Sequence, residues 1–136
     1  MEIETIKKFL DKKNTIAFIG ATMQKDKWGY KKYKEIKDAG FEVYPINPKY
    51  DSINGDKCFP DLKSLIEVLD EKLDFVITII PPKVTEQIVE QCKIFGVDKI
   101  WMQPGSESEK AIKFCEENGI KAVHGICIVV DALKKL

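Results

Sequence analysis

Short apolar segments alternate with amphipathic segments along this chain, and that alternation restricts the fold more than any other feature. The apolar segments predict strands at 15–19, 41–46, 74–80, 99–102 and 120–123. Strands that alternate with helices form a parallel sheet with right-handed crossovers and helices on both faces. The sequence therefore predicts an α/β protein, with three layers and a mostly parallel sheet of five strands or slightly more.

The segments between these strands carry apolar residues at helical spacing. They predict helices over 2–12, from near 29 to Gly40, over 62–69, from 84 to Gly96, from Ser106 to Gly119, and over 128–136. Asp61 is expected to cap the third of these helices, and Ser106 with Glu109 forms a capping-box pattern before the fifth. The Lys-rich pieces at 7–13 and 31–37 are expected to be solvated helix faces. This order of elements predicts a Rossmann-like α/β/α fold.

Length and composition exclude several classes of protein. A chain of 136 residues predicts one domain over 1–136, and its zero net charge gives no general attraction to nucleic acid. We expect no membrane association, because the longest apolar run is too short to span a bilayer and no signal peptide is visible. Four scattered cysteines and a single histidine make a metal site improbable and favour the cytoplasm.

The loops that follow the strands are the segments where such a sheet binds ligands. The first is the most informative, because Gly20 ends a strand and lets a phosphate approach the backbone. The next helix begins near Gly29, and its free N–H groups would favour an anion, with Lys25 and Lys27 nearby. The full G-x-G-x-x-G motif is absent, so this loop alone is equally consistent with an ordinary strand–helix turn.

The loop after the second strand narrows the choice of nucleotide. A site for NAD requires an acidic residue at this position, to accept hydrogen bonds from the ribose hydroxyls. Here Asn47, Pro48 and Lys49 occupy it. A lysine would attract a ribose phosphate instead, although an exposed loop lysine is also the commonest fate of that residue type.

Together these segments resemble one family. Gly20-Ala21-Thr22, Pro45-Ile46-Asn47-Pro48, Pro81-Pro82 and Trp101-Met102-Gln103-Pro104-Gly105 follow its order across nearly the whole chain. The chain is similar to small stand-alone CoA-binding domain proteins, and to the CoA-binding domains of succinyl-CoA synthetase α subunits and ADP-forming acyl-CoA synthetases. The resemblance implies coenzyme A as the ligand, bound along the strand ends.

The resemblance also implies particular site residues. Gly20, Ala21 and Thr22 would contact the diphosphate, and Asn47, Pro48 and Lys49 the adenosine end. Pro81 and Pro82 would border the adenine or its ribose. The family often has a small polar residue where this chain has Tyr30, so only backbone contacts are expected there. The full predicted set is Gly20, Ala21, Thr22, Lys27, Gly29, Tyr30, Asn47, Pro48, Lys49, Pro81, Pro82, Gln103, Pro104 and Gly105.

The functional hypothesis is a CoA or acyl-CoA binding protein without catalytic activity of its own, acting as a sensor, carrier or regulatory subunit. The catalytic histidine of the similar synthetases lies in a further domain, and no catalytic set surrounds His124 here. Two alternatives remain open: an NADP-binding redox protein, or an interaction domain that has lost its ligand. The acyl group, a homodimer or partner protein, and any role for Cys127 or His124 beyond packing also remain open.

Overall fold

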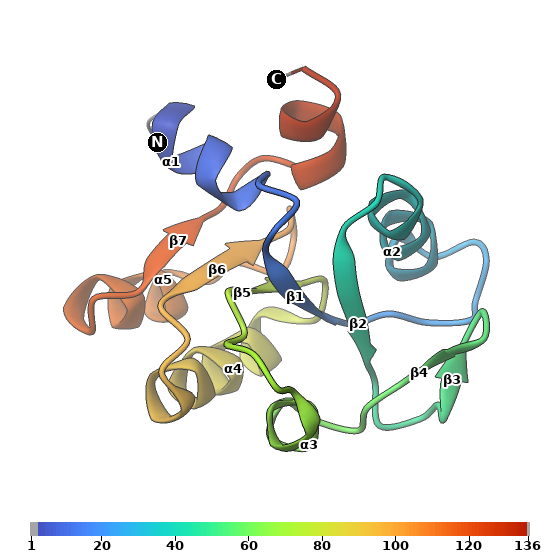
Figure 1. Ribbon diagram of the computed structural model, residues 1–136. Coiled ribbons are helices and arrows are strands. Elements are labelled where there is room, and N and C mark those ends of the chain that lie inside the picture. Colours follow the sequence, from blue (N-terminus) through green and yellow to red (C-terminus); the bar gives the residue numbers. More distant parts are fainter. Residues whose placement is uncertain (1–2, 136) are drawn as a thin grey trace.

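The computed structural model describes residues 3–135 and contains one central parallel sheet (Figure 1). The sheet has five strands in the order β2-β1-β5-β6-β7. Their bounds are Thr15–Ile19 for β1, Glu42–Ile46 for β2, Phe75–Thr78 for β5, Lys99–Met102 for β6 and Lys121–Val123 for β7. Every neighbouring pair in this sheet is parallel, which confirms the predicted α/β Rossmann-like architecture. Each strand is somewhat shorter than, or equal to, the segment that the sequence predicted.

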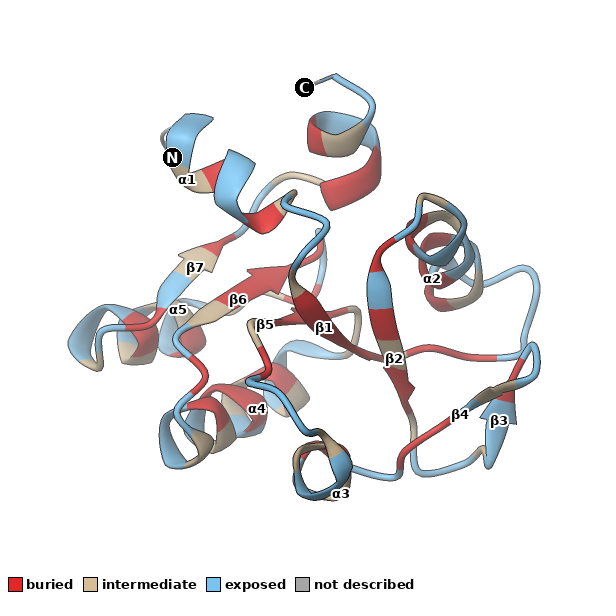
Figure 2. Cartoon of the chain, viewed as in Figure 1, coloured by how far each residue is buried: buried red, intermediate tan, exposed pale blue. Residues whose placement is uncertain are grey.

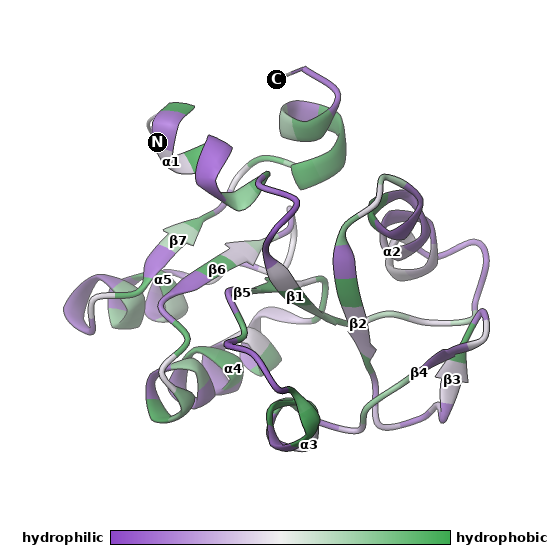
Figure 3. Cartoon of the chain, viewed as in Figure 1, coloured by the Kyte–Doolittle hydropathy of each residue, from purple (hydrophilic) through white to green (hydrophobic). Residues whose placement is uncertain are grey.

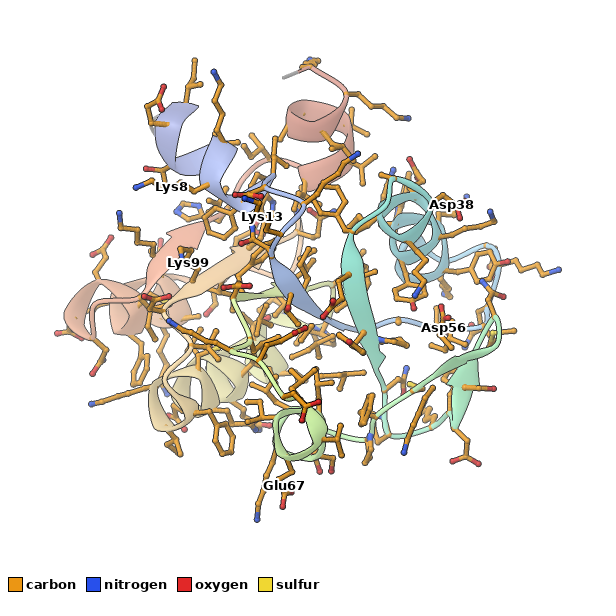
Figure 4. All side chains as sticks on the ribbon, in the orientation of Figure 1. Lys8, Lys13, Asp38, Asp56, Glu67 and Lys99 are labelled. Carbon is orange, nitrogen blue, oxygen red and sulfur yellow. The ribbon has the colours of Figure 1, made fainter. Side chains whose placement is uncertain are left out.

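Helices cover both faces of the sheet and bury two separate apolar cores. On one face lie α1 (Ile3–Phe9), α2 (Trp28–Asp38) and the C-terminal turn η1 (Ile128–Leu133). On the other lie α3 (Leu62–Val68), α4 (Pro82–Phe95) and α5 (Glu109–Glu117). Lys8 on α1 and Glu67 on α3, both labelled in Figure 4, mark these opposite outer layers. The central strands β1 and β5 are entirely buried, whereas the edge strands β2 and β7 each include an exposed residue (Figure 2).

Aromatic rings fill the core beneath α1. Phe9 packs edge-on against Phe75, with ring centroids 4.8 Å apart, and against Trp101 at 5.4 Å. Such edge-to-face contacts are preferred by aromatic pairs and fix the helix above β5 and β6. The helix is shorter than the predicted 2–12, because the Asn14 side chain donates to the carbonyl oxygens of Lys8 and Phe9 and ends it there. Residue 2 lies outside the described residues.

Two serines near α5 correct the predicted capping box. Ser108, not Ser106, is the N-cap, and its hydroxyl oxygen accepts from the Ala111 amide at 3.0 Å. Ser106 is buried, and its hydroxyl bonds to Thr78 at the end of β5 and to the Gln103 carbonyl oxygen. A loop serine can hydrogen-bond either to buried groups or to a helix terminus. For Ser106, the contacts with Thr78 and Gln103 take the place of the cap. Asp61 caps α3 as predicted, accepting from the Ser64 amide.

A small hairpin that was not predicted from the sequence follows β2. Strands β3 (Ser52–Ile53) and β4 (Asp56–Lys57) pair antiparallel around Asn54 and Gly55. Both turn residues have positive φ, as a two-residue hairpin turn requires, and the Asn-Gly pair is its usual sequence signature.

The predicted C-terminal helix at 128–136 is also shorter: it is a π-helical turn, η1, and residue 136 lies outside the described residues. Among residues 3–135, no helix has the length and apolar character needed to cross a membrane.

Two glycines let α2 approach the sheet. A Cβ atom on Gly29 would lie 2.2 Å from the carbonyl oxygen of Gly20. A Cβ atom on Gly20 would in turn lie 2.2 Å from the carbonyl oxygen of Ile79, and Gly20 has a φ of +110°. Both neighbouring atoms are backbone, so a side chain at either position would displace an element rather than a flexible group. The first turn of α2 therefore rests directly on the turn after β1.

We predict that Gly29→Ala destabilises the protein. In an open helix this substitution usually stabilises by up to about 1 kcal/mol. Here the added methyl group has no room, and overpacking of this kind costs about 1–3 kcal/mol. Urea unfolding followed by circular dichroism should therefore show a net loss of about 1–2 kcal/mol. Lys31→Ala, at an exposed position in the same helix, is the control and should change stability by less than about 0.5 kcal/mol. A Gly29→Ala variant as stable as the wild type would contradict the tight contact.

Candidate functional site

The candidate site lies at the carboxyl ends of the strands, where the strand order reverses. From β1 the chain crosses to β2 on one side, and β5 then pairs with β1 on the other. The crossovers on the two sides of β1 run to opposite faces of the sheet, which leaves a crevice beyond the ends of β1 and β5. The turn at Gly20 and the residues after Thr78 border this crevice.

Hydrogen bonds join the turn after β1 to the loop after β2. The Asn47 side chain donates to the carbonyl oxygen of Ala21 at 2.9 Å, and its own oxygen accepts from the Lys49 amide at 2.9 Å. The hydroxyl of Thr22 bonds to the hydroxyl of Tyr50 at 3.0 Å. The predicted residues of these two loops are therefore brought together. Ala21 and Thr22 are buried, whereas Lys49 is exposed beside them.

The N-terminal end of α2 lies against the same turn and has no side-chain cap. Lys27 is the N-cap residue and makes no side-chain capping bond, and the first turn contains no acidic residue. The backbone N–H groups at such an end carry partial positive charge and attract anions. Exposed Lys25 and Lys27 precede this turn in the chain. The contact between Gly29 and Gly20 holds these groups at the end of β1.

A cavity of about 380 Å³ adjoins this turn, between α2, the loops after β5 and β6, and the C-terminal turn. We call it the strand-end cavity. Its apolar lining consists of Trp28, Ile79, Pro104 and Val130. Its remaining lining residues are Lys32, Gln103, Cys127 and Asp131. The volume falls within the range that holds small molecules and cofactors.

The polar groups of the cavity wall are bound to other parts of the protein. Buried Gln103 accepts from the Ile128 amide at 2.8 Å and donates to the Cys127 sulfur at 3.2 Å. The Asp131 carboxylate accepts from the Cys127 amide at 2.7 Å. Trp101 also donates to the carbonyl oxygen of Ile126 at 3.0 Å. These bonds hold the C-terminal turn in place as one wall of the cavity.

The remaining predicted residues fall into two further places. Pro81, Pro104 and Gly105 line an open groove of about 320 Å³ beyond β5 and β6, and Pro82 is the exposed first residue of α4. Tyr30 instead lines a groove of about 330 Å³ between α2 and the β3–β4 hairpin. Asp38 and Asp56, labelled in Figure 4, belong to that second groove. The structure thus separates Tyr30 from the cavity that Gln103 and Pro104 line.

Several cavity residues were missed by the sequence analysis. The prediction that 31–37 is a solvated helix face is wrong for Lys32, because this residue is only 7% exposed. Its ammonium group pairs with Glu35 at 3.1 Å and lies 5.1 Å from the centre of the Trp28 ring. Trp28 and Lys32 are four residues apart, so helical spacing places them on one face. No sequence pattern of this kind connects Val130 and Asp131 to the cavity.

The cysteines differ sharply in their surroundings. Cys58, Cys92 and Cys115 are buried, whereas Cys127 is half-buried on the cavity wall. Burial raises the pKa of the Cys92 thiol to about 12 and that of Cys115 to about 11. Both therefore stay protonated at neutral pH and serve as core residues. No group of three or more metal-ligating side chains occurs within residues 3–135, and His124 is exposed at the end of β7.

Comparisons with known proteins agree with this geometry. The sequence is 38% identical over 90 residues to the ADP-forming acetate–CoA ligase of Methanocaldococcus jannaschii, a match covering 66% of this chain and 12% of that enzyme. It is 29% identical to the uncharacterized protein YneT of Bacillus subtilis, over 92% of this chain and 90% of that protein. A conserved hypothetical protein from Pyrococcus furiosus superimposes with a TM-score of 0.79 at 36% identity, covering 88% of this chain and 99% of that structure.

The family model for the CoA binding domain matches residues 14–132, which include all five strands of the parallel sheet and every lining residue of the strand-end cavity. The chain therefore belongs to the CoA-binding domain family.

Proposed function

We propose that this protein binds coenzyme A, free or acylated, along the carboxyl edge of its sheet, and acts as a carrier, sensor or regulatory subunit rather than as a catalyst. One observation carries the proposal: the uncapped first turn of α2 rests against the glycine turn after β1. Backbone N–H groups at a helix terminus, next to a glycine that leaves the backbone open, suit a diphosphate. Membership of the CoA-binding domain family favours coenzyme A among the compounds that carry one.

The two ends of the crevice suit the two ends of that molecule. Lys49 lies exposed beyond β2, beside the turn after β1, and would neutralise the phosphate on the ribose of coenzyme A. On the other side of the turn, the pantetheine arm would run toward the strand-end cavity beyond β5 and β6. In this arrangement the ligand lies across β2, β1, β5 and β6 in their order in the sheet.

The cavity wall supports binding without chemistry. Gln103 and Asp131 hydrogen-bond to the backbone of the C-terminal segment, and Lys32 pairs with Glu35, so each of these groups already has a partner within the protein. A general acid or base must reach the substrate within hydrogen-bond distance. The one histidine, His124, is exposed at the end of β7 and does not line the cavity.

We predict that coenzyme A raises the melting temperature of the protein. A ligand at about one hundred times its dissociation constant adds about 2.7 kcal/mol of stability. For a domain of this size the midpoint should rise on the order of 5–10 °C in differential scanning fluorimetry. Dephospho-CoA should give a smaller shift and NAD little. A larger shift with NADP than with coenzyme A would favour a redox protein, and no shift with any of the four would favour an interaction domain without a ligand.

We predict that Lys49→Ala weakens coenzyme A more than dephospho-CoA. A partly exposed lysine–phosphate contact contributes about 1 kcal/mol, which corresponds to somewhat less than tenfold in affinity. Isothermal titration calorimetry with both ligands measures the difference. Lys121→Ala is the control. Lys121 is the first residue of β7, at the edge of the sheet away from the crevice, so this substitution should affect neither ligand. Equal losses for the two ligands in Lys49→Ala would remove Lys49 from the proposed contact.

A further inference from the structure

Apolar side chains line one part of the strand-end cavity. Trp28 at the start of α2 is 63% exposed and Val130 in η1 is 44% exposed, and both line this cavity. Large exposed hydrophobic side chains that gather around one hollow mark a binding site for an apolar group. Figure 3 shows that η1, which supplies Val130, is hydrophobic along most of its length. Ile79 and Pro104 extend the apolar lining to the ends of β5 and β6.

The charges at the cavity disfavour a charged group inside it. The Asp131 carboxylate stands on the wall and would repel a second carboxylate. The Lys32 ammonium is paired with Glu35 at 3.1 Å, and Glu35 also lies 3.5 Å from the ammonium of Lys134. An anionic ligand group would have to compete with Glu35 for Lys32 and then lose its own hydration. An uncharged aliphatic group has neither cost.

We propose that the strand-end cavity binds the acyl group of an acyl-CoA, and that this acyl group is uncharged, aliphatic and longer than acetyl. This inference rests on the proposed function, because coenzyme A must first lie across the sheet with its thioester end toward β5 and β6. The ligand class would then be aliphatic acyl-CoA rather than free coenzyme A or the CoA ester of a dicarboxylic acid. The C-terminal turn, through Val130, contributes directly to this selectivity.

The test is a calorimetric series on the full chain with CoA, acetyl-CoA, butyryl-CoA, hexanoyl-CoA and succinyl-CoA. Each added methylene that enters the cavity should tighten binding about fourfold. Succinyl-CoA should bind more weakly than butyryl-CoA. Val130→Ser, at a 44% exposed position, should reduce the gain per methylene to roughly twofold or less. Ile94→Ser, at a 75% exposed position on α4 outside the cavity, is the matched control and should leave the series unchanged.

Two kinds of result would overturn the inference, and they are distinguishable. If coenzyme A binds but affinity does not rise with acyl length, or if succinyl-CoA binds most tightly, the cavity is not an aliphatic acyl site and the proposed function stands. A series in which Val130→Ser and Ile94→Ser behave alike would likewise remove the cavity from acyl recognition. If neither coenzyme A nor any acyl-CoA binds, the proposed function fails and this inference fails with it.

Discussion

The contact between three backbone segments, at Gly29, Gly20 and Ile79, is the constraint on which the carboxyl edge of this sheet depends. Neither glycine could carry a Cβ atom without striking a neighbouring carbonyl oxygen at 2.2 Å. The close approach brings the open end of α2 to the point where the strand order reverses. A side chain at either glycine would push α2 away from the strand ends. The free N–H groups of its first turn would then no longer border the crevice.

A second constraint acts on the far side of the crevice, through Gln103. Its buried amide uses one end to accept from the Ile128 backbone and the other to donate to the Cys127 sulfur. A buried amide left unpaired would cost about 1–3 kcal/mol, so the docked position of the C-terminal turn is favoured by both bonds. The motif that suggested a ligand contact for Gln103 thus has a structural role here. It positions Val130 and Asp131, which the sequence analysis had not identified, on the cavity wall.

The parts of the structure that could be predicted depend on residues close in sequence, and most of those that could not depend on residues far apart in sequence. The strands could be found because parallel strands buried on both faces are continuous apolar runs, as at Phe75–Thr78. Lys32 could not be placed, since a lysine at a helical position is usually solvated, and the cavity that it lines also includes Gln103, Val130 and Asp131, which are distant in sequence. The exchange of Ser106 for Ser108 as the cap has the same origin, because the contact of Ser106 with Thr78 is distant in sequence. The hairpin at Asn54 and Gly55, in contrast, had a local signal that could have been used.

The two halves of the crevice differ in chemistry, and under the proposed function this division would decide where selectivity arises. The turn at Gly20 and the first turn of α2 offer backbone groups, which suit any diphosphate and cannot distinguish one nucleotide from another. Discrimination must therefore come from side chains at the two ends. Lys49 lies at one end, beyond β2, and the apolar wall formed by Trp28 and Val130 lies at the other. Lys49 and Val130 lie outside both the turn after β1 and the first turn of α2, so either can be replaced without changing the residues of the glycine contact.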